Sequence, residues 1–87
     1  LRAQIQTREA LYRQSPQVGD YARSYAITLA MLADLYADHD RAREACPLYE
    51  EARGVFGDLE ARGLLSEQDR SSAVRMISER QTTHCGQ

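Results

Sequence analysis

Two stretches with a helical spacing of apolar residues, separated by a short polar break, constrain the fold of this chain more than any other feature. In the first stretch, Leu29, Leu32 and Tyr36 follow one another at intervals of three and four residues, which places them on one face of a helix. The polar break Asp38-His39-Asp40 ends this pattern. A second stripe then follows at the same period, made by Ala45, Leu48, Tyr49, Ala52 and Phe56. The sequence therefore predicts an antiparallel helical hairpin.

Small residues alternate with large ones along both stripes. The small residues are Ala26, Ala30, Ala33, Ala37, Ala42, Ala45 and Ala52. Alanine lets two helix backbones approach closely, while the neighbouring large side chains fill the spaces on either side. We therefore expect a close interface between the two helices. Its expected members are Leu29, Leu32, Ala33 and Tyr36 from the first helix and Ala45, Tyr49 and Ala52 from the second.

The spacing of these residues resembles the tetratricopeptide repeat, a helical hairpin of about 34 residues. The first helix, Leu29-x-x-Leu32-Ala33-x-x-Tyr36, is similar to the family's W-x-x-L-G-x-x-Y. The second helix, Ala45-x-x-x-Tyr49-x-x-Ala52, is similar to A-x-x-x-F followed by a small residue. The chain departs from the family pattern at Leu29, Ala33, Asp40 and Gly57. An Ala- and Leu-rich hairpin unrelated to the family is the alternative interpretation.

A second similarity lies further along the chain. The run ACPLYEEAR, the later LEARGLLSEQDR and a closing Cys are similar to the last repeat of the tetratricopeptide regions that follow bacterial serine/threonine kinase domains. This similarity implies that the chain is the C-terminal part of a larger bacterial regulatory protein.

The resemblance also implies a peptide-binding groove, because the first helices of successive repeats in that family line a concave surface. The matching positions are Ile27, Ala30, Asp34, Ala37 and Asp38, with Tyr21 and Tyr25 as aromatic contacts. Two aspartates there disfavour capture of a peptide's terminal carboxylate and favour a basic or mixed ligand. In the competing interpretation, the aspartates lie on a solvent-exposed face and both tyrosines belong to the core.

Composition favours an all-α chain and excludes two classes of partner. Hydrophobic residues make up 43% and charged residues 28% of the 87 residues, as in ordinary globular chains. Runs of Val, Ile and Thr, from which strands are built, are almost lacking. The charges are interspersed and sum to −2, so no basic face for nucleic acid is expected. No apolar run approaches the ~20 residues of a membrane span, and we expect a cytoplasmic protein without membrane association.

A further helix is expected before the hairpin, within a single small domain of residues 1–87. Residues 1–14 have helical character and are ended by Ser15-Pro16, because proline cannot continue the hydrogen-bond ladder. In the repeat interpretation this is the second helix of a preceding repeat, with Leu1, Ile5 and Tyr12 on its apolar face. Half a repeat leaves such a face unburied. The sequence therefore predicts either a fragment of a longer protein or a homodimer through the face of residues 1–12.

The hairpin is expected over residues 18–62, as helices 18–38 and 41–62. Asp40 is predicted to cap the second helix. Pro47 either bends this helix near residues 44–46, which is the favoured interpretation, or breaks it so that a new helix begins at Pro47.

A capping helix is expected after the hairpin. Gly63 predicts a helix stop, and Ser66 followed by Asp69 resembles a capping box. These signals predict a helix over residues 66–81 that closes a repeat stack with one apolar face inward. Residues 82–87 show no periodicity and are predicted to be coil.

No catalytic motif is found, so a non-enzymatic protein without cofactor or metal is expected. Neither His39 nor His84 has the neighbours of a base–nucleophile pair, and His84-Cys85 supplies too few ligands for a tetrahedral metal site. Cys46 is interpreted as a small buried hydrophobe. A Cys46–Cys85 bridge requires the tail to fold back over the hairpin, whereas thiols in the cytoplasm are usually reduced.

Two functional hypotheses follow. The first is a protein–protein interaction or scaffold module of tetratricopeptide type. The second is a structural segment for homo-oligomerisation with no separate ligand.

Overall fold

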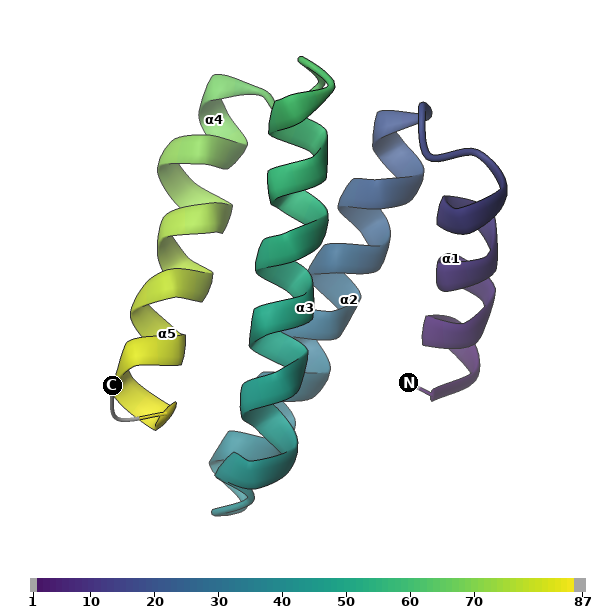
Figure 1. The fold of residues 1–87 in the computed structure, drawn as a ribbon. Helices are drawn as coiled ribbons and strands as arrows, with labels where there is room; N and C mark the ends of the chain where they lie inside the picture. The colour runs from purple at the N-terminus through teal and green to yellow at the C-terminus, as the bar shows by residue number, and fades with distance from the viewer. Residues whose placement is uncertain (1, 86–87) are drawn as a thin grey trace.

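The structure, a computed structural model, describes residues 2–85 and is all-α, with no strand among these residues (Figure 1). This confirms the predicted fold class. The chain begins with helix α1 (Arg2–Gln14), followed by α2 (Gly19–Asp38) and α3 (Ala42–Ala61). The last helical stretch is α4 (Glu67–Asp69), a π-helical turn η1 (Arg70–Val74) and α5 (Arg75–Cys85), and we call these three together the C-terminal helix.

The helices pack side by side in the order in which they occur in the chain. Helix α2 lies between α1 and α3, and α3 lies between α2 and α5 (Figure 1). Successive helices run in opposite directions, so α2 and α5 run in the same direction. The C-terminal ends of α2 and α5 therefore lie at the same end of the molecule. No described helix is both long and apolar enough to cross a membrane.

The core lies mainly between α2 and α3. Alanines at the contact between the two helices are completely buried, as close approach of two backbones requires; they are Ala22, Ala26, Ala33, Ala45 and Ala52. The large buried side chains beside them include Tyr25, Leu29, Tyr49 and Phe56, and the C-terminal helix adds only Ile77 to this cluster. Of the residues expected at the hairpin interface, Leu29, Ala33, Ala45, Tyr49 and Ala52 belong to the buried cluster. Leu32 is also buried, and Tyr36 packs against the cluster while remaining partly exposed.

The turn between α2 and α3 differs from the expected one. Asp40 has a left-handed φ of 58°. The N-cap residue of α3 is Arg41, not Asp40, and no side chain forms a capping hydrogen bond there. Instead, the amide of Arg41 donates to the carbonyl of Tyr36 at 2.9 Å and that of Asp40 to Ala37 at 3.1 Å. These are the two bonds of a Schellman motif, which ends a helix with one left-handed residue. The prediction of Asp40 as an N-cap was therefore wrong, since this residue belongs to the turn that terminates α2 after Asp38.

Gly63 ends α3 in the same way, as predicted. Its φ is 72°, which glycine adopts at no steric cost. The amide of Leu64 donates to Leu59 at 2.8 Å and that of Gly63 to Glu60 at 3.0 Å. Within α3, helical structure continues through Pro47, so the interpretation in which the helix breaks and restarts there was wrong.

The C-terminal helix begins where expected and ends later. The hydroxyl of Ser66 accepts a hydrogen bond from the amide of Asp69 at 3.1 Å, which is the predicted cap. Residues 82–85 were predicted to be coil but are helical, because Cys85 is bonded to Cys46 and the ring of His84 stacks on Tyr49. The sequence left the bridge open as an alternative and gave no sign of the stacking of His84 on Tyr49. Residues 86 and 87 of the predicted tail lie outside the described residues.

Helix α1 packs against the core through the apolar face that was expected to be unburied. Ile5 and Tyr12 pack against the core, and the ring of Tyr12 stacks on Tyr25 with 5.7 Å between centroids. The face proposed for self-association is therefore directed inward at these two positions. Leu1 lies outside the described residues. The large apolar side chain that α1 exposes is Leu11.

Candidate interaction groove

A groove of about 190 Å³ runs between α2 and the C-terminal helix. We call it the α2–α5 groove. Its lining is almost wholly apolar and comes from Ile27, Ala30, Met31 and Asp34 of α2 and from Ala73, Met76, Ile77 and Arg80 of the C-terminal helix. Met31 and Met76 are its most exposed apolar members, at 54% and 44% of their surfaces. The groove therefore presents two flexible thioether side chains, one from each wall, to solvent.

The same helical spacing builds both walls. On α2 the lining residues follow one another at positions i, i+3, i+4 and i+7 from Ile27, and on the C-terminal helix they follow the same spacing from Ala73. Residues at this spacing share one face of a helix. Because α2 and α5 run in the same direction, each wall carries its charged residue at the same end of the groove.

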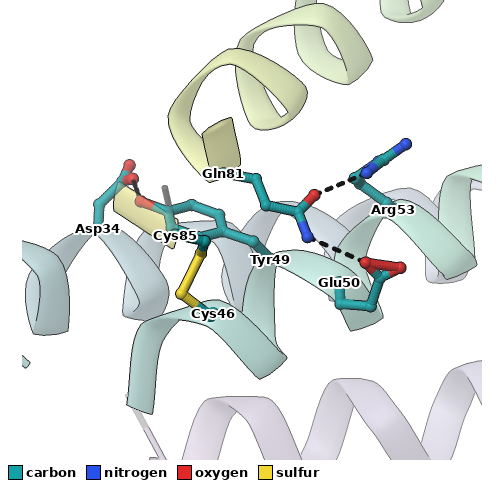
Figure 2. The surroundings of a disulfide bond; sticks show 7 residues. All are labelled: Asp34, Cys46, Tyr49, Glu50, Arg53, Gln81 and Cys85. Atoms are coloured by element: carbon teal, nitrogen blue, oxygen red, sulfur yellow. Dashed lines mark hydrogen bonds between the residues drawn. A yellow bond between two sulfur atoms is a disulfide. The ribbon is translucent and has the colours of Figure 1, made fainter. Parts of the chain in front are cut away.

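Asp34 and Arg80 form an ion pair at that end. Asp34 also accepts a hydrogen bond from the hydroxyl of Tyr49 on α3, as Figure 2 shows. Burial raises the pKa of the Tyr49 hydroxyl, and the hydrogen bond to Asp34 raises it further. The charge of Asp38, which follows Asp34 by four residues on α2, acts in the same direction. One acid of the pair predicted at the groove is thus neutralised by Arg80, while Asp38 is exposed.

The groove contains three of the residues implied by the family resemblance, namely Ile27, Ala30 and Asp34. Asp38 lies one turn beyond the lining on α2. Ala37 is partly buried against the core. Tyr25 lies outside the groove: it is 2% exposed, stacks on Tyr12 and donates a hydrogen bond to Glu51. Its burial agrees with the interpretation of this tyrosine as a core residue.

The second wall of the groove was missed by sequence reasoning. The sequence predicted a helix over residues 66–81 with one apolar face but gave no reason to place that face beside α2. The matching spacing from Ile27 and from Ala73 is the one signal available in the sequence, and it does not say which helices are neighbours. That placement depends on contacts between residues far apart in the chain.

A disulfide between Cys46 and Cys85 joins α3 to the end of α5, with 5.9 Å between their Cα atoms (Figure 2). Beside it, the side-chain amide of Gln81 accepts a hydrogen bond from Arg53 at 2.8 Å and donates one to Glu50 at 2.9 Å. Of the two alternatives, the structure therefore contains the bridge and not two reduced cysteines. Disulfides persist mainly in oxidising compartments, so the bridge lends no support to the expected cytoplasmic location.

No group of three or more His, Cys, Asp or Glu side chains in residues 2–85 is arranged to hold a metal ion. His39 has its Nδ1 2.9 Å from the carbonyl oxygen of Leu35 and is exposed. Comparisons with protein families, curated proteins and solved structures found no match to this chain.

Proposed function

We propose that this chain is a non-catalytic protein-interaction module whose α2–α5 groove binds a short amphipathic segment of a partner protein. The observation that carries the proposal is an apolar groove flanked by Met31 and Met76. An aliphatic side chain of the partner enters between the two methionines, which adapt to its shape because each has three rotatable bonds. Grooves of this kind bind the apolar face of an amphipathic helix.

Charge determines the chemistry next to that side chain. The C-terminal ends of α2 and α5 lie at the same end of the molecule, and each places the negative end of its helix dipole there. Asp38 adds an exposed carboxylate, whereas Asp34 is already paired with Arg80. A Lys or Arg about one helical turn from the aliphatic side chain complements this end of the groove. The proposed ligand is therefore basic as well as apolar.

The tetratricopeptide interpretation belongs to the same proposal. Helices that follow one another in antiparallel pairs support it, together with the spacing at Leu29, Leu32 and Tyr36. In this proposal the chain is the C-terminal part of a larger bacterial regulatory protein such as a serine/threonine kinase. Upstream coding sequence with kinase motifs or further repeats is the expected finding, and an immediate start codon would contradict it.

Selection from a displayed library of random peptides tests the groove. The oxidised protein is immobilised, and the affinities of selected peptides are measured by fluorescence polarisation. We expect an aliphatic residue with a nearby Lys or Arg, and a loss of binding of about tenfold or more in Met31→Glu or Met76→Glu, because a charge then faces the apolar lining.

Leu35→Glu is the matched control. Leu35 is an exposed apolar residue of α2, 46% exposed, but does not line the groove. It changes the net charge by the same amount as Met31→Glu. Equal losses in the two variants, or none in either, would refute the groove as the binding site.

Self-association is the second candidate function. The outer face of α1 has a shallow hollow lined by Ala3, Gln4, Thr7, Arg8 and Leu11. A second copy of the chain that covers this hollow gives a homodimer with no separate ligand. Light scattering tests this: a dimer that becomes a monomer in Leu11→Glu favours it, and a monomer at every concentration excludes it.

A further inference from the structure

The two walls of the α2–α5 groove are attached to the molecule very differently. Helix α2 buries seven residues, including Tyr25 and Leu29. The whole C-terminal helix buries only Asp69 and Ile77, and only Ile77 belongs to the apolar core. Ala73, Val74 and Cys85 pack against this core while remaining partly exposed. Apolar burial therefore holds the α5 wall less firmly than the α2 wall.

The polar contacts of α5 do not make up this difference. Arg80 is 44% exposed in its ion pair with Asp34, and the hydrogen bonds of Gln81 to Glu50 and Arg53 are exposed as well. Exposed pairs of this kind contribute little, because water competes for both partners. The ring of His84 also stacks on Tyr49 at this end, and the remaining attachment is the covalent Cys46–Cys85 bridge. It joins two residues 39 positions apart in the sequence and so restricts the unfolded chain strongly.

A π-helical turn also divides the C-terminal helix into two parts that are attached to the molecule differently. The π-helical turn Arg70–Val74 separates α4 from α5. On the α4 side, Ser66 caps the helix and Asp69 pairs with Arg23 of α2 at 2.7 Å. A π-turn interrupts the regular α-helical ladder, so α5 can detach while α4 stays in place.

From these observations we propose that the Cys46–Cys85 disulfide controls the α2–α5 groove, and that its reduction by a dithiol detaches α5 and removes one wall. The groove loses Met76, Ile77 and Arg80 on detachment and keeps the α2 wall. This inference rests on the proposed function for its binding readout. The detachment of α5 is measurable without any ligand.

The reaction is a thiol–disulfide exchange in which both cysteines are partly exposed to the reductant. One thiolate of the dithiol attacks one sulfur of the bridge, which forms a mixed disulfide and expels the other cysteine as a thiolate. The second thiol of the reductant then breaks the mixed disulfide and forms the reductant's own disulfide. Two electrons pass to the bridge, and the two protons lost by the dithiol end on Cys46 and Cys85.

Amide hydrogen exchange of the full chain, oxidised and then reduced with dithiothreitol, tests the detachment. Residues 75–85 are expected to exchange at least about tenfold faster after reduction, while α2 and α3 keep their protection. The Cys46→Ala/Cys85→Ala variant is expected to match the reduced protein in both conditions. Gln81→Ala, which removes two hydrogen bonds and keeps the bridge, is expected to match the oxidised protein.

Affinity for a peptide selected on the oxidised protein is measured on the same samples. A loss of about tenfold or more on reduction, reversed by reoxidation, supports control of the groove. Unchanged exchange in residues 75–85 would overturn the proposal, and so would loss of protection throughout α2 and α3, which is global unfolding. Faster exchange with unchanged affinity would overturn control of the groove. If the oxidised protein selects no peptide, the proposed function fails, while the exchange data still decide whether α5 detaches.

Discussion

Asp34 is the residue at which three helices meet. It lies on α2, accepts a hydrogen bond from Tyr49 of α3 and forms an ion pair with Arg80 of α5. Two partners satisfy its carboxylate, and no buried side-chain nitrogen or oxygen in residues 3–85 lacks a hydrogen bond. Because the Tyr49 ring is also part of the core, this one side chain connects the packing of the hairpin to the end of the groove.

Tyr49→Phe isolates the hydrogen bond in that arrangement. The ring and its stacking on His84 remain, while Asp34 loses a donor and keeps Arg80. We expect the free energy of unfolding to fall by about 1.5–3 kcal/mol, as for a hydrogen bond to a charged group. Urea denaturation measures the change. Tyr21→Phe, at a partly exposed position of α2, is the control and is expected to change stability by less than about 0.5 kcal/mol.

Substitution of Ser66 tests whether the stability of the C-terminal helix depends on its N-terminal cap. Its hydroxyl accepts from the amide of Asp69, one of the amides that a helix start leaves free. Ser66→Ala is expected to cost about 1 kcal/mol in unfolding free energy and to speed amide exchange in the first turn of the helix. Ser72→Ala is the matched control, since the Ser72 hydroxyl bonds back to the carbonyl of Gln68 at an exposed site within the helix. A loss as large in Ser72→Ala would show that the cap has no special role.

Pro47 lowers the stability of helix α3. It lies inside the helix, exposed, where its ring nitrogen has no hydrogen to donate to the carbonyl four residues earlier. Pro47→Ala is expected to raise the free energy of unfolding by about 1–3 kcal/mol, because it restores that bond and replaces a poor helix former with the best one. Urea denaturation of the oxidised protein measures the gain. An unchanged or lower stability would mean that the helix has adapted its backbone to the proline.

The elements that the sequence predicted are those determined by residues close together in the chain. The stripes around Leu29 and Tyr49 and the stop at Gly63 are local patterns, so the hairpin was predictable. The left-handed Asp40 was not, because an aspartate before a helix is also a common cap. The helical end of α5 and the second wall of the groove involve contacts between residues far apart in the chain, such as Cys46 and Cys85, which are 39 positions apart. No local periodicity reports such a contact.

Tyrosine–carboxylate hydrogen bonds connect the helices at the scale of the whole molecule. Tyr12 of α1 donates to Asp58 of α3 at 3.0 Å, Tyr25 of α2 donates to Glu51 of α3, and Tyr49 of α3 donates to Asp34 of α2. In each tyrosine, burial raises the pKa of the hydroxyl first, and the hydrogen bond to the carboxylate raises it further. All three hydroxyls must therefore stay protonated for the fold to keep these bonds.

This requirement predicts how stability depends on pH. An unfolded tyrosine loses its proton near pH 10, whereas these folded tyrosines keep theirs, so above about pH 10 the folded state binds more protons than the unfolded state. Stability is fully present below about pH 10 and falls as the pH rises towards the folded pKa values. Each such tyrosine contributes a slope of about 1.4 kcal/mol per pH unit.

Urea denaturation at several values between about pH 9 and pH 11 measures this slope, and absorbance of tyrosinate follows the ionisation. We expect the absorbance of these tyrosines to appear together with the loss of helix, since ionisation requires unfolding. The Tyr25→Phe/Tyr49→Phe variant starts from a lower stability and is expected to lose it less steeply, because two of the linked protons are gone. A stability that does not change up to about pH 11 would contradict the linkage, because the hydroxyls would then ionise equally well in the folded and unfolded chain.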